Sequence, residues 1–305
     1  MSSALGRAVR TMAPAKINWT LEVMGKRGDG YHEIRSVMQT IDLYDVVYLE
    51  AADTLSLEVS GERGATEDDL ALKAARILAE RVGRELPAVI RIEKRIPVAA
   101  GLGGGSSDAA AVLRCMNRLH GLGLANEELV AIGAEVGSDV PFFTYGGTAL
   151  AEGRGERVTP LRDVTERWAV LIVPPVAPVE KTGRMYAALT QADFADGSAT
   201  QGAVEAIQAG RTLDDWLITN AFERAAYERF HDLAAYRYAL VKAGASAVYL
   251  AGSGPGLFAL AKDGDTARET ATRVRPDGGR VHAARTLRAR EATSVKPVNG
   301  SAVGG

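Results

Sequence analysis

A glycine- and serine-rich segment, Gly101–Asp108, has the composition of a phosphate-binding loop. Glycine lets the backbone approach an anion closely with its N–H groups exposed, and a helix that begins directly afterwards adds the positive end of its dipole. The segment is not the usual mononucleotide loop, because no Gly-Lys-Ser/Thr follows it. It is not the dinucleotide fingerprint either, because Ser106 stands where the third glycine belongs. The structural alternative is a flexible linker or a tight entry into a helix, and we interpret the segment as a phosphate cradle.

Two charged side chains outside this segment have types suited to catalysis. Asp139 stands in a constrained turn, where Pro141 is expected to hold Val140 extended. Partial desolvation in such a turn would let the carboxyl group serve as an acid or a base. Lys16 lies at the start of an alternating segment. Taken alone, Asp139 would be a helix or turn cap and Lys16 a solvated charge, so these two positions do not by themselves decide the chemistry.

Three further segments have residues that could face a ligand. Asn18 lies two residues after Lys16, on the same face of the segment. Asp29–His32 follows the next turn and, in isolation, is typical of a surface hairpin. Gly252–Gly256 separates two apolar runs. It is either a hairpin loop or a second close approach of the backbone, closing over a ligand where the two halves of the chain meet.

Composition narrows the class of protein. The 305 residues are 47% hydrophobic and 24% charged, with a formal net charge of −2. This balance excludes a disordered chain, and without a basic excess we expect no nucleic-acid partner. Cys115, the single cysteine, excludes a disulfide framework and is expected in the core. No apolar run approaches the roughly 18 residues of a membrane span, and the N-terminus lacks the apolar core of a signal peptide. We therefore expect no membrane contact and a cytoplasmic location.

Apolar periodicity predicts mixed strands and helices in the first half of the chain. Lys16–Val23 alternates and predicts one half-buried strand. Further strands are predicted at 36–41, 46–49, 54–59, 88–93 and 147–152. A helix capped by Asp68 and Asp69 is predicted to end at Gly83. Two more helices are predicted at 109–120, with Ser106 or Ser107 as N-cap and Asp108 at the positive end of its dipole, and at 126–136.

The second half of the chain has a different order of predicted strands and helices. Strands are predicted at 168–173, 247–250, 257–261 and 280–286, and helices at 180–189, 213–230, 233–242 and 266–274. The order of strand, helices, two strands, helix and strand is a split βαβ, ferredoxin-like pattern. The sequence predicts a flexible N-terminal extension (1–11), a first domain (12–160), a second domain (161–289) and a disordered tail (290–305).

Six segments together identify a family. In chain order over about residues 12–290 they are Pro14–Asn18, Asp29–His32, Pro97–Ala110, Gly137–Phe143, Gly153–Glu156 and Gly252–Gly254. On these segments the chain resembles the 4-diphosphocytidyl-2-C-methyl-D-erythritol kinase family. That family belongs to the superfamily of galactokinase, homoserine kinase, mevalonate kinase and phosphomevalonate kinase.

The resemblance implies an α+β, two-domain small-molecule kinase fold. Its N-terminal α/β domain would contain a left-handed βαβ unit, its C-terminal domain would be ferredoxin-like, and the active site would lie in the cleft between them. The implied activity is ATP-dependent phosphorylation of the 2-hydroxyl of a cytidine diphosphate joined to methylerythritol, in the non-mevalonate pathway to isoprenoid precursors. The implied partner is this small molecule, acted on by a monomer or homodimer.

The resemblance also implies roles for individual residues. Asp139 would be the catalytic base and Lys16 its electrostatic partner. Tyr31 and His32 would contact the cytosine, Asn18 the substrate near the base or the sugar alcohol, and Tyr186 would supply a second aromatic ring. The ATP phosphates would be held by Pro97, Val98, Ala99, Ala100, Gly101, Leu102, Gly103, Gly104, Gly105, Ser106 and Ser107. Mg²⁺ would bridge the phosphates and keep several waters, with Ser106 as a candidate ligand.

Some features depart from the family pattern, and other functions remain as alternatives. Ala251 stands where the family often has a small hydroxyl residue, and Pro255-Gly256 stiffens the neighbouring loop. A kinase of the same superfamily acting on homoserine or a mevalonate should lack the Asp29–His32 segment. A regulatory ATP-binding protein should have lost Lys16 or Asp139, and both are present. A dehydrogenase is disfavoured by Ser106.

Overall fold

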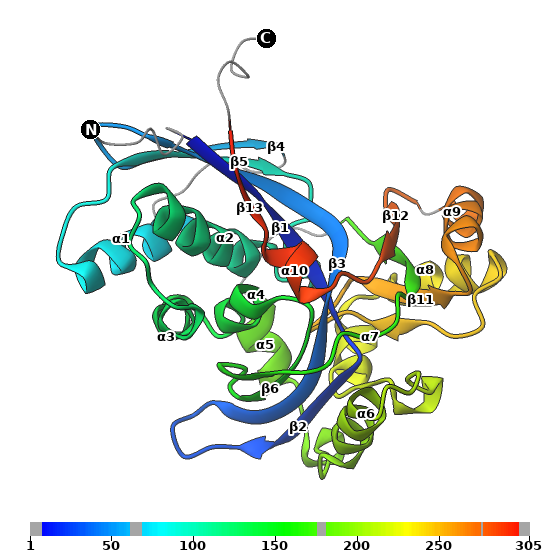
Figure 1. Ribbon diagram of the computed structural model, residues 1–305. Coiled ribbons are helices and arrows are strands. Elements are labelled where there is room, and N and C mark those ends of the chain that lie inside the picture. Colours follow the sequence, from blue (N-terminus) through cyan, green and yellow to red (C-terminus); the bar gives the residue numbers. More distant parts are fainter. Residues whose placement is uncertain (1–7, 62–68, 176–180, 276, 299–305) are drawn as a thin grey trace.

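A large sheet and a smaller one organise the chain. The computed structural model describes residues 8–61, 69–175, 181–275 and 277–298. In Figure 1 the large sheet crosses the molecule, with helices α1–α4 packed on one side and the smaller sheet with α8 and α9 at the far end. No helix among these residues is long and apolar enough to cross a membrane.

The large sheet is built around one long strand, β3 (His32–Ala51). β3 pairs antiparallel with β1 (Ala8–Asn18), β2 (Thr20–Lys26), β5 (Ala88–Lys94) and β6 (Thr148–Gly153). The sheet also contains β4 (Ser56–Gly61), β7 (Arg157–Pro160), β9 (Thr219–Asn220) and β13 (Val295–Pro297). β4 and β5 are parallel and joined through α1, which makes a βαβ unit.

Four helices cover one side of this sheet and form a core with it. They are α1 (Leu70–Val82), α2 (Gly104–Leu119), α3 (Asn126–Val136) and α4 (Val140–Tyr145). Cys115 lies in this core, where burial raises its thiol pKa to about 12, so the expectation of a core cysteine is confirmed. The caps predicted for α1 are also confirmed: Asp69 accepts a hydrogen bond from Ala71 N (2.9 Å), and Gly83 ends the helix in the left-handed conformation. Asp68 lies outside the described residues.

The expectation of a half-buried strand at Lys16–Val23 is wrong in two respects. The segment bends at Trp19 between β1 and β2, and both of its faces are buried. One face joins an apolar core with α6 (Ser198–Gln208). On the other face Thr20 and Glu22 bond to Thr200 of the same helix, so their polarity reflects internal hydrogen bonds and not solvent.

The start of α2 is also earlier than the sequence predicts. The helix begins at Gly104, with Gly103 at its N-cap in the left-handed conformation (φ 74°). Ser106 and Ser107 therefore lie inside the helix and make no cap hydrogen bond. Glycine at this helix start permits close packing, because a Cβ at Gly104 would lie 3.2 Å from Ile96 Cγ2.

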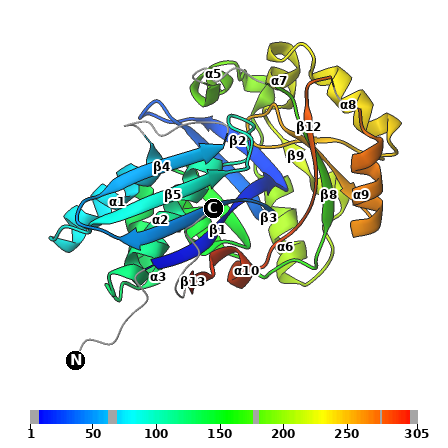
Figure 2. The ribbon, with the colours of Figure 1, turned by 90° about the horizontal axis from the view of Figure 1, so that it is seen from above.

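Both ends of the described chain are more ordered than expected. Ala8–Thr11, predicted as part of a flexible extension, forms the beginning of β1. Residues 290–298, predicted as part of a disordered tail, contribute to α10 (Ala289–Thr293) and β13, which pairs antiparallel with β1. Figure 2 shows β13 beside β1. β13 has only three residues, which are too few to show the alternation of apolar and polar residues that predicts a strand. Residues 1–7 and 299–305 lie outside the described residues.

The smaller sheet has the predicted ferredoxin-like arrangement. Its order is β10 (Tyr249–Leu250), β11 (Leu257–Ala261), β8 (Trp168–Val173) and β12 (Arg280–Arg285), all antiparallel. It packs with α7 (Glu223–Arg229), α8 (Leu233–Lys242) and α9 (Gly264–Arg273).

The long helix predicted at 213–230 is wrong. The segment instead forms a 3₁₀ turn (Asp215–Leu217), β9 and α7, because Thr219 and Asn220 pair in parallel with β2 of the large sheet. One apolar core therefore contains side chains of both halves, among them Ile17, Leu171 and Leu217. The boundary near residue 160 stays a prediction.

Candidate active site

A cavity of about 1100 Å³ lies between the glycine-rich loop, the strands that end beside it and the short helix α5 (Lys181–Ala187). It is lined by every residue to which the sequence analysis assigned a catalytic or binding role except Ser107, which is fully buried inside α2. The fold thus brings candidate residues as far apart in the sequence as Lys16 and Tyr186 to the wall of one cavity. The cavity is also lined by residues to which the sequence analysis assigned no individual role in the site, among them Asp69, Lys94, Ser138, Arg154, Thr182 and Ser253.

The glycine loop packs backbone against backbone on the second glycine segment. A Cβ at Gly101 (φ 82°) would lie 2.2 Å from the carbonyl oxygen of Ala251, and one at Gly252 would lie 2.5 Å from the carbonyl oxygen of Gly101. Gly256 N donates to Ala100 O (3.0 Å). The glycines are therefore required by this approach, and Gly252–Gly256 is more than the turn of a hairpin. The loop ends at the N-terminus of α2, where free backbone N–H groups suit a phosphate.

Lys16 is buried and oriented by a chain of hydrogen bonds. It is therefore not the solvated surface charge that its sequence position alone would suggest. Its Nζ donates to Asn18 Oδ1 (2.7 Å), and Asn18 Nδ2 lies 2.8 Å from Ser36 Oγ. Burial lowers the pKa of Lys16 below its ordinary 10.5, while the carboxylate of Asp139 acts in the opposite direction. Its main chain is also held, because Lys16 N donates to Leu102 O in the glycine loop (3.0 Å).

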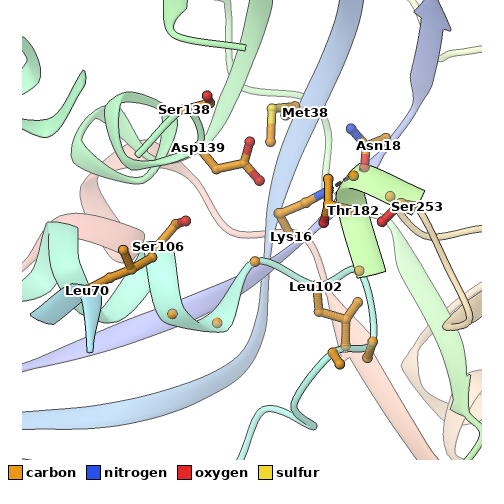
Figure 3. A pocket seen from close by; sticks show the side chains of 18 of the residues that line it. Lys16, Asn18, Met38, Leu70, Leu102, Ser106, Ser138, Asp139, Thr182 and Ser253 are labelled. Carbon is orange, nitrogen blue, oxygen red and sulfur yellow. Dashed lines mark hydrogen bonds between the residues drawn. The ribbon is translucent and has the colours of Figure 1, made fainter. Parts of the chain in front are cut away.

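Asp139 directly precedes α4, and its carboxylate does not cap that helix. The expectation that Val140 is extended is wrong, because Val140 begins the helix. Proline is tolerated in a first helical turn, where its missing N–H has no partner to lose. Figure 3 shows the Asp139 carboxylate and the Lys16 ammonium pointing into the same part of the cavity. Gly155 lies beside this carboxylate: a Cβ there would be in ordinary van der Waals contact with Asp139 Oδ1 at 3.6 Å.

Aromatic rings line another part of the cavity. Tyr31 is 53% exposed, with the Arg154 guanidinium over its ring at 4.7 Å from the centroid. The His32 ring stacks on Tyr186, with centroids 5.0 Å apart, and Tyr186 in turn meets Phe222 edge-on. Burial lowers the pKa of His32 below 6.5, which favours the neutral imidazole. Arg154 lies in the Gly153–Glu156 segment that contributes to the family resemblance. This membership is the one sequence signal that could have indicated Arg154 as a site residue.

Beneath the loop, Lys94 bridges two buried carboxylates. Its Nζ contacts Asp45 and Asp108, the latter at 2.5 Å. Asp45 also accepts hydrogen bonds from the backbone N–H groups of Arg95 and Ile96. Burial raises the pKa of Asp108 above its usual range. Asp108 thus lies in a charged cluster and not at the helix dipole as the sequence analysis expected, and the cluster holds the end of β5 against the first turns of α2.

The described residues contain no group of three or more His, Cys, Asp and Glu side chains that could hold a metal ion. Oxygen donors do line the cavity: Ser106 at the start of α2 and Asp139 across from it (Figure 3). Such a sparse set fits Mg²⁺, which usually keeps several waters and binds substrate phosphates, better than it fits a metal held by a protein cage.

Known proteins resemble the chain in both sequence and fold. Two family profiles match, the GHMP kinases N terminal domain over residues 69–147 and the GHMP kinases C terminal domain over residues 203–279. The chain is 43% identical over 277 residues to 4-diphosphocytidyl-2-C-methyl-D-erythritol kinase of Dehalococcoides mccartyi, covering 90% of this chain and 97% of that protein. It is 40% identical over 283 residues to the protein of the same name from Symbiobacterium thermophilum, covering 90% and 98%.

Solved structures of kinases resemble the fold of this chain, in agreement with the sequence matches. A crystal structure of 4-(cytidine 5'-diphospho)-2C-methyl-D-erythritol kinase matches with a TM-score of 0.77 and 34% identity, covering 91% of this chain and 98% of that one. A homoserine kinase from Cytophaga hutchinsonii matches with a TM-score of 0.72 and 19% identity, covering 97% and 99%, which supports the fold alone. The chain therefore belongs to the 4-diphosphocytidyl-2-C-methyl-D-erythritol kinase family of the GHMP kinases.

Proposed function

We propose that this chain phosphorylates the 2-hydroxyl of 4-diphosphocytidyl-2-C-methyl-D-erythritol with ATP, in the synthesis of isoprenoid precursors. The observation that carries this proposal is the content of one cavity. It combines a glycine-rich loop at a helix start, an aspartate beside a buried lysine, and aromatic rings suited to a nucleobase. Family membership supplies the acceptor, because the relatives at 40–43% identity carry this substrate in their names.

The phosphate-binding role is assigned to the segment Pro97–Ser106. Its left-handed residues, Ala99, Gly101 and Gly103, shape the backbone before α2, and the N-terminus of α2 favours negative charge. Ser107 was expected to share this role. Its burial within α2 supports a structural role instead.

Asp139 is proposed as the base and Lys16 as its electrostatic partner. Asp139 accepts the proton of the 2-hydroxyl as that oxygen bonds to the γ-phosphorus. The bond from the γ-phosphorus to the bridging oxygen of ADP breaks, and ADP takes that bond's electron pair. Lys16 stabilises the ionised carboxylate and the negative charge of the transferring group. Most of the rate enhancement in phosphoryl transfer comes from such positioning and electrostatics.

Tyr31, His32 and Tyr186 are proposed to recognise the cytosine, and Asn18 the substrate close to Lys16. The exposed Tyr31 ring offers a face for stacking. His32 and Tyr186 already stack on each other, so they act as one aromatic wall of the cavity.

Mg²⁺ is proposed as the accompanying metal ion, with Ser106 and phosphate oxygens among its ligands. When bound, it would neutralise charge on the phosphates. The proposal further includes a cytoplasmic monomer or homodimer without a nucleic-acid partner, and a division into an ATP-binding domain up to about residue 160 and a ferredoxin-like domain after it.

The test is ADP release by the purified protein with Mg²⁺-ATP and three acceptors: the cytidine diphosphate methylerythritol substrate, homoserine and mevalonate. We expect turnover with the first alone, and mass spectrometry should find one added phosphate on it. Turnover with homoserine or mevalonate, or with none of the three, would contradict the proposed acceptor. ATP binding measured by calorimetry then separates a wrong acceptor from a wrong nucleotide site.

A further inference from the structure

Arg114 is a buried cation inside the helical layer. It lies in the middle of α2 and is 7% exposed. One terminal nitrogen, Nη1, donates to the carbonyl oxygen of Phe143 at 2.6 Å. Nε and Nη2 are buried and have no hydrogen-bond partner among the residues that the structure describes. Burial lowers the pKa of Arg114 to about 10, so the side chain still carries its charge at neutral pH.

This arrangement is costly for stability alone. A buried charge with one acceptor and two unpartnered nitrogens, which carry three N–H donors, loses more hydration than it regains, and an apolar side chain of similar volume would pack there at lower cost. The residue that receives its one hydrogen bond therefore indicates what Arg114 does.

That residue belongs to α4, which has only six residues. A helix of this length is not stable by itself, so its position depends on what holds it. Phe143 lies near its C-terminal end, where carbonyl groups lack partners within the helix and where the dipole favours a cation. Arg114 supplies both the missing donor and the positive charge.

Phe143 also contacts two parts of the candidate active site. Its backbone N donates to the carbonyl oxygen of Asp139 (3.3 Å). Its ring packs on the phosphate loop, because a Cβ at Gly103 would lie 2.7 Å from Phe143 Cζ. One residue thus connects Arg114, the residue that bears the proposed base, and the loop proposed to hold the phosphates.

We propose that Arg114 is a positioning residue for phosphoryl transfer: by holding the Phe143 carbonyl it fixes α4 against α2, and so fixes the Asp139 carboxylate relative to the phosphate loop. This inference rests on the proposed role of Asp139 as the base. Arg114 does not line the cavity, so its effect is expected on the rate of the chemical step and not on the binding of either substrate.

The experiment compares Arg114→Met, Arg114→Lys and the control Leu78→Ala with the wild type. Leu78 is a fully buried side chain of α1 in the same core and makes no bond to α4. We measure kcat, the KM of both substrates, and hydrogen exchange of the backbone amides of residues 140–146, all well below each variant's melting temperature.

We expect Arg114→Met to lower kcat at least tenfold, to leave both KM values within threefold, and to speed amide exchange in α4 at least tenfold. Arg114→Lys, which keeps a charged donor, should recover most of both losses. Leu78→Ala should lower the melting temperature and leave kcat within twofold. If Arg114→Met does not fold, Arg114→Gln, whose side chain is shorter and uncharged, takes its place under the same criteria.

A kcat within twofold of the wild type in Arg114→Met, or a loss equal to that in Leu78→Ala, would overturn the inference. So would unchanged α4 exchange. A wild-type protein without kinase activity would instead refute the proposed function. In that case the exchange measurement still decides whether Arg114 holds α4.

Discussion

Lys16 Nζ and Asn18 Oδ1 are joined by a 2.7 Å hydrogen bond within the buried wall of the cavity. An ammonium group has three N–H donors, so this bond orients the group and leaves two donors for other partners. Asn18 is held in turn by Ser36, whose hydroxyl donates to Thr20 O at 2.5 Å. The lysine is thus preorganised before any substrate arrives, which is the condition under which a charge contributes most to catalysis.

The pH dependence of turnover should report the protonation of Lys16. Because burial lowers its pKa below 10.5, kcat should fall as pH rises through that lowered value. Lys16→Arg should turn over more slowly but lack this falling limb, because a guanidinium stays charged over the range tested. The measurement is kcat between about pH 6 and 10 for both proteins. The same falling limb in Lys16→Arg would assign it to another group.

The same shift has a consequence for stability. The unfolded chain binds the Lys16 proton more tightly than the folded chain does. The contribution of this group to the free energy of unfolding therefore rises with pH, between the folded pKa and 10.5. The free energy of unfolding, measured by urea titration at several pH values in this interval, should rise more steeply with pH in the wild type than in Lys16→Met.

Asp139→Asn should fold normally, bind ATP and lose most turnover. The change removes a proton acceptor without changing the shape of the side chain, and we expect kcat to fall by about 10²–10⁴-fold. Ser138→Ala, which changes the neighbouring cavity residue, is the control and should stay within a few fold of the wild type. Near-normal turnover in Asp139→Asn would exclude this residue as the base.

Tyr31→Ala should weaken binding of the cytidine substrate. Stacking of a base on an aromatic ring contributes about 1–3 kcal/mol, so the KM for this substrate should rise roughly tenfold or more. The ring is 53% exposed, so the melting temperature should hardly change, and the KM for ATP should not change. Tyr31→Phe keeps the ring and should bind normally. Unchanged affinity in Tyr31→Ala would count against stacking at this position.

Gly101→Ala should separate the two glycine segments. The added Cβ would meet the Ala251 carbonyl oxygen at 2.2 Å, at a left-handed φ of 82°. Such overpacking costs about 1–3 kcal/mol of stability. We expect a lower melting temperature and a higher KM for ATP. Gly28→Ala is the matched control, because no atom lies within 4 Å of its added Cβ. Equal behaviour of the two variants would show that the contact is unimportant.

Local patterns predicted much of this architecture. The capped helix α1, the helix α3 and the strands of the smaller sheet are all visible in short windows of sequence. The glycine-rich loop was recognisable because its composition is unusual. The family's motifs then selected Lys16, Asp139 and the aromatic residues, which the structure brings together around one cavity.

What the sequence could not provide depends on contacts between distant segments. β9 interrupts a region with helical character because it pairs with β2, roughly two hundred residues earlier in the chain. Lys94 joins Asp45 and Asp108 across separations of 49 and 14 residues, so no spacing rule finds the cluster. The role of Arg114 is invisible to local patterns for a similar reason, because its partner, Phe143, is 29 residues away.

The pairing of β13 with β1 has a consequence for association between chains. Val295–Pro297 pairs with Val9–Thr11 and so covers this part of the outer edge of β1. An uncovered strand edge is a template for pairing with other chains. A chain in which β13 is detached therefore exposes backbone N–H and C=O groups of β1 to a second copy, and is expected to aggregate more readily.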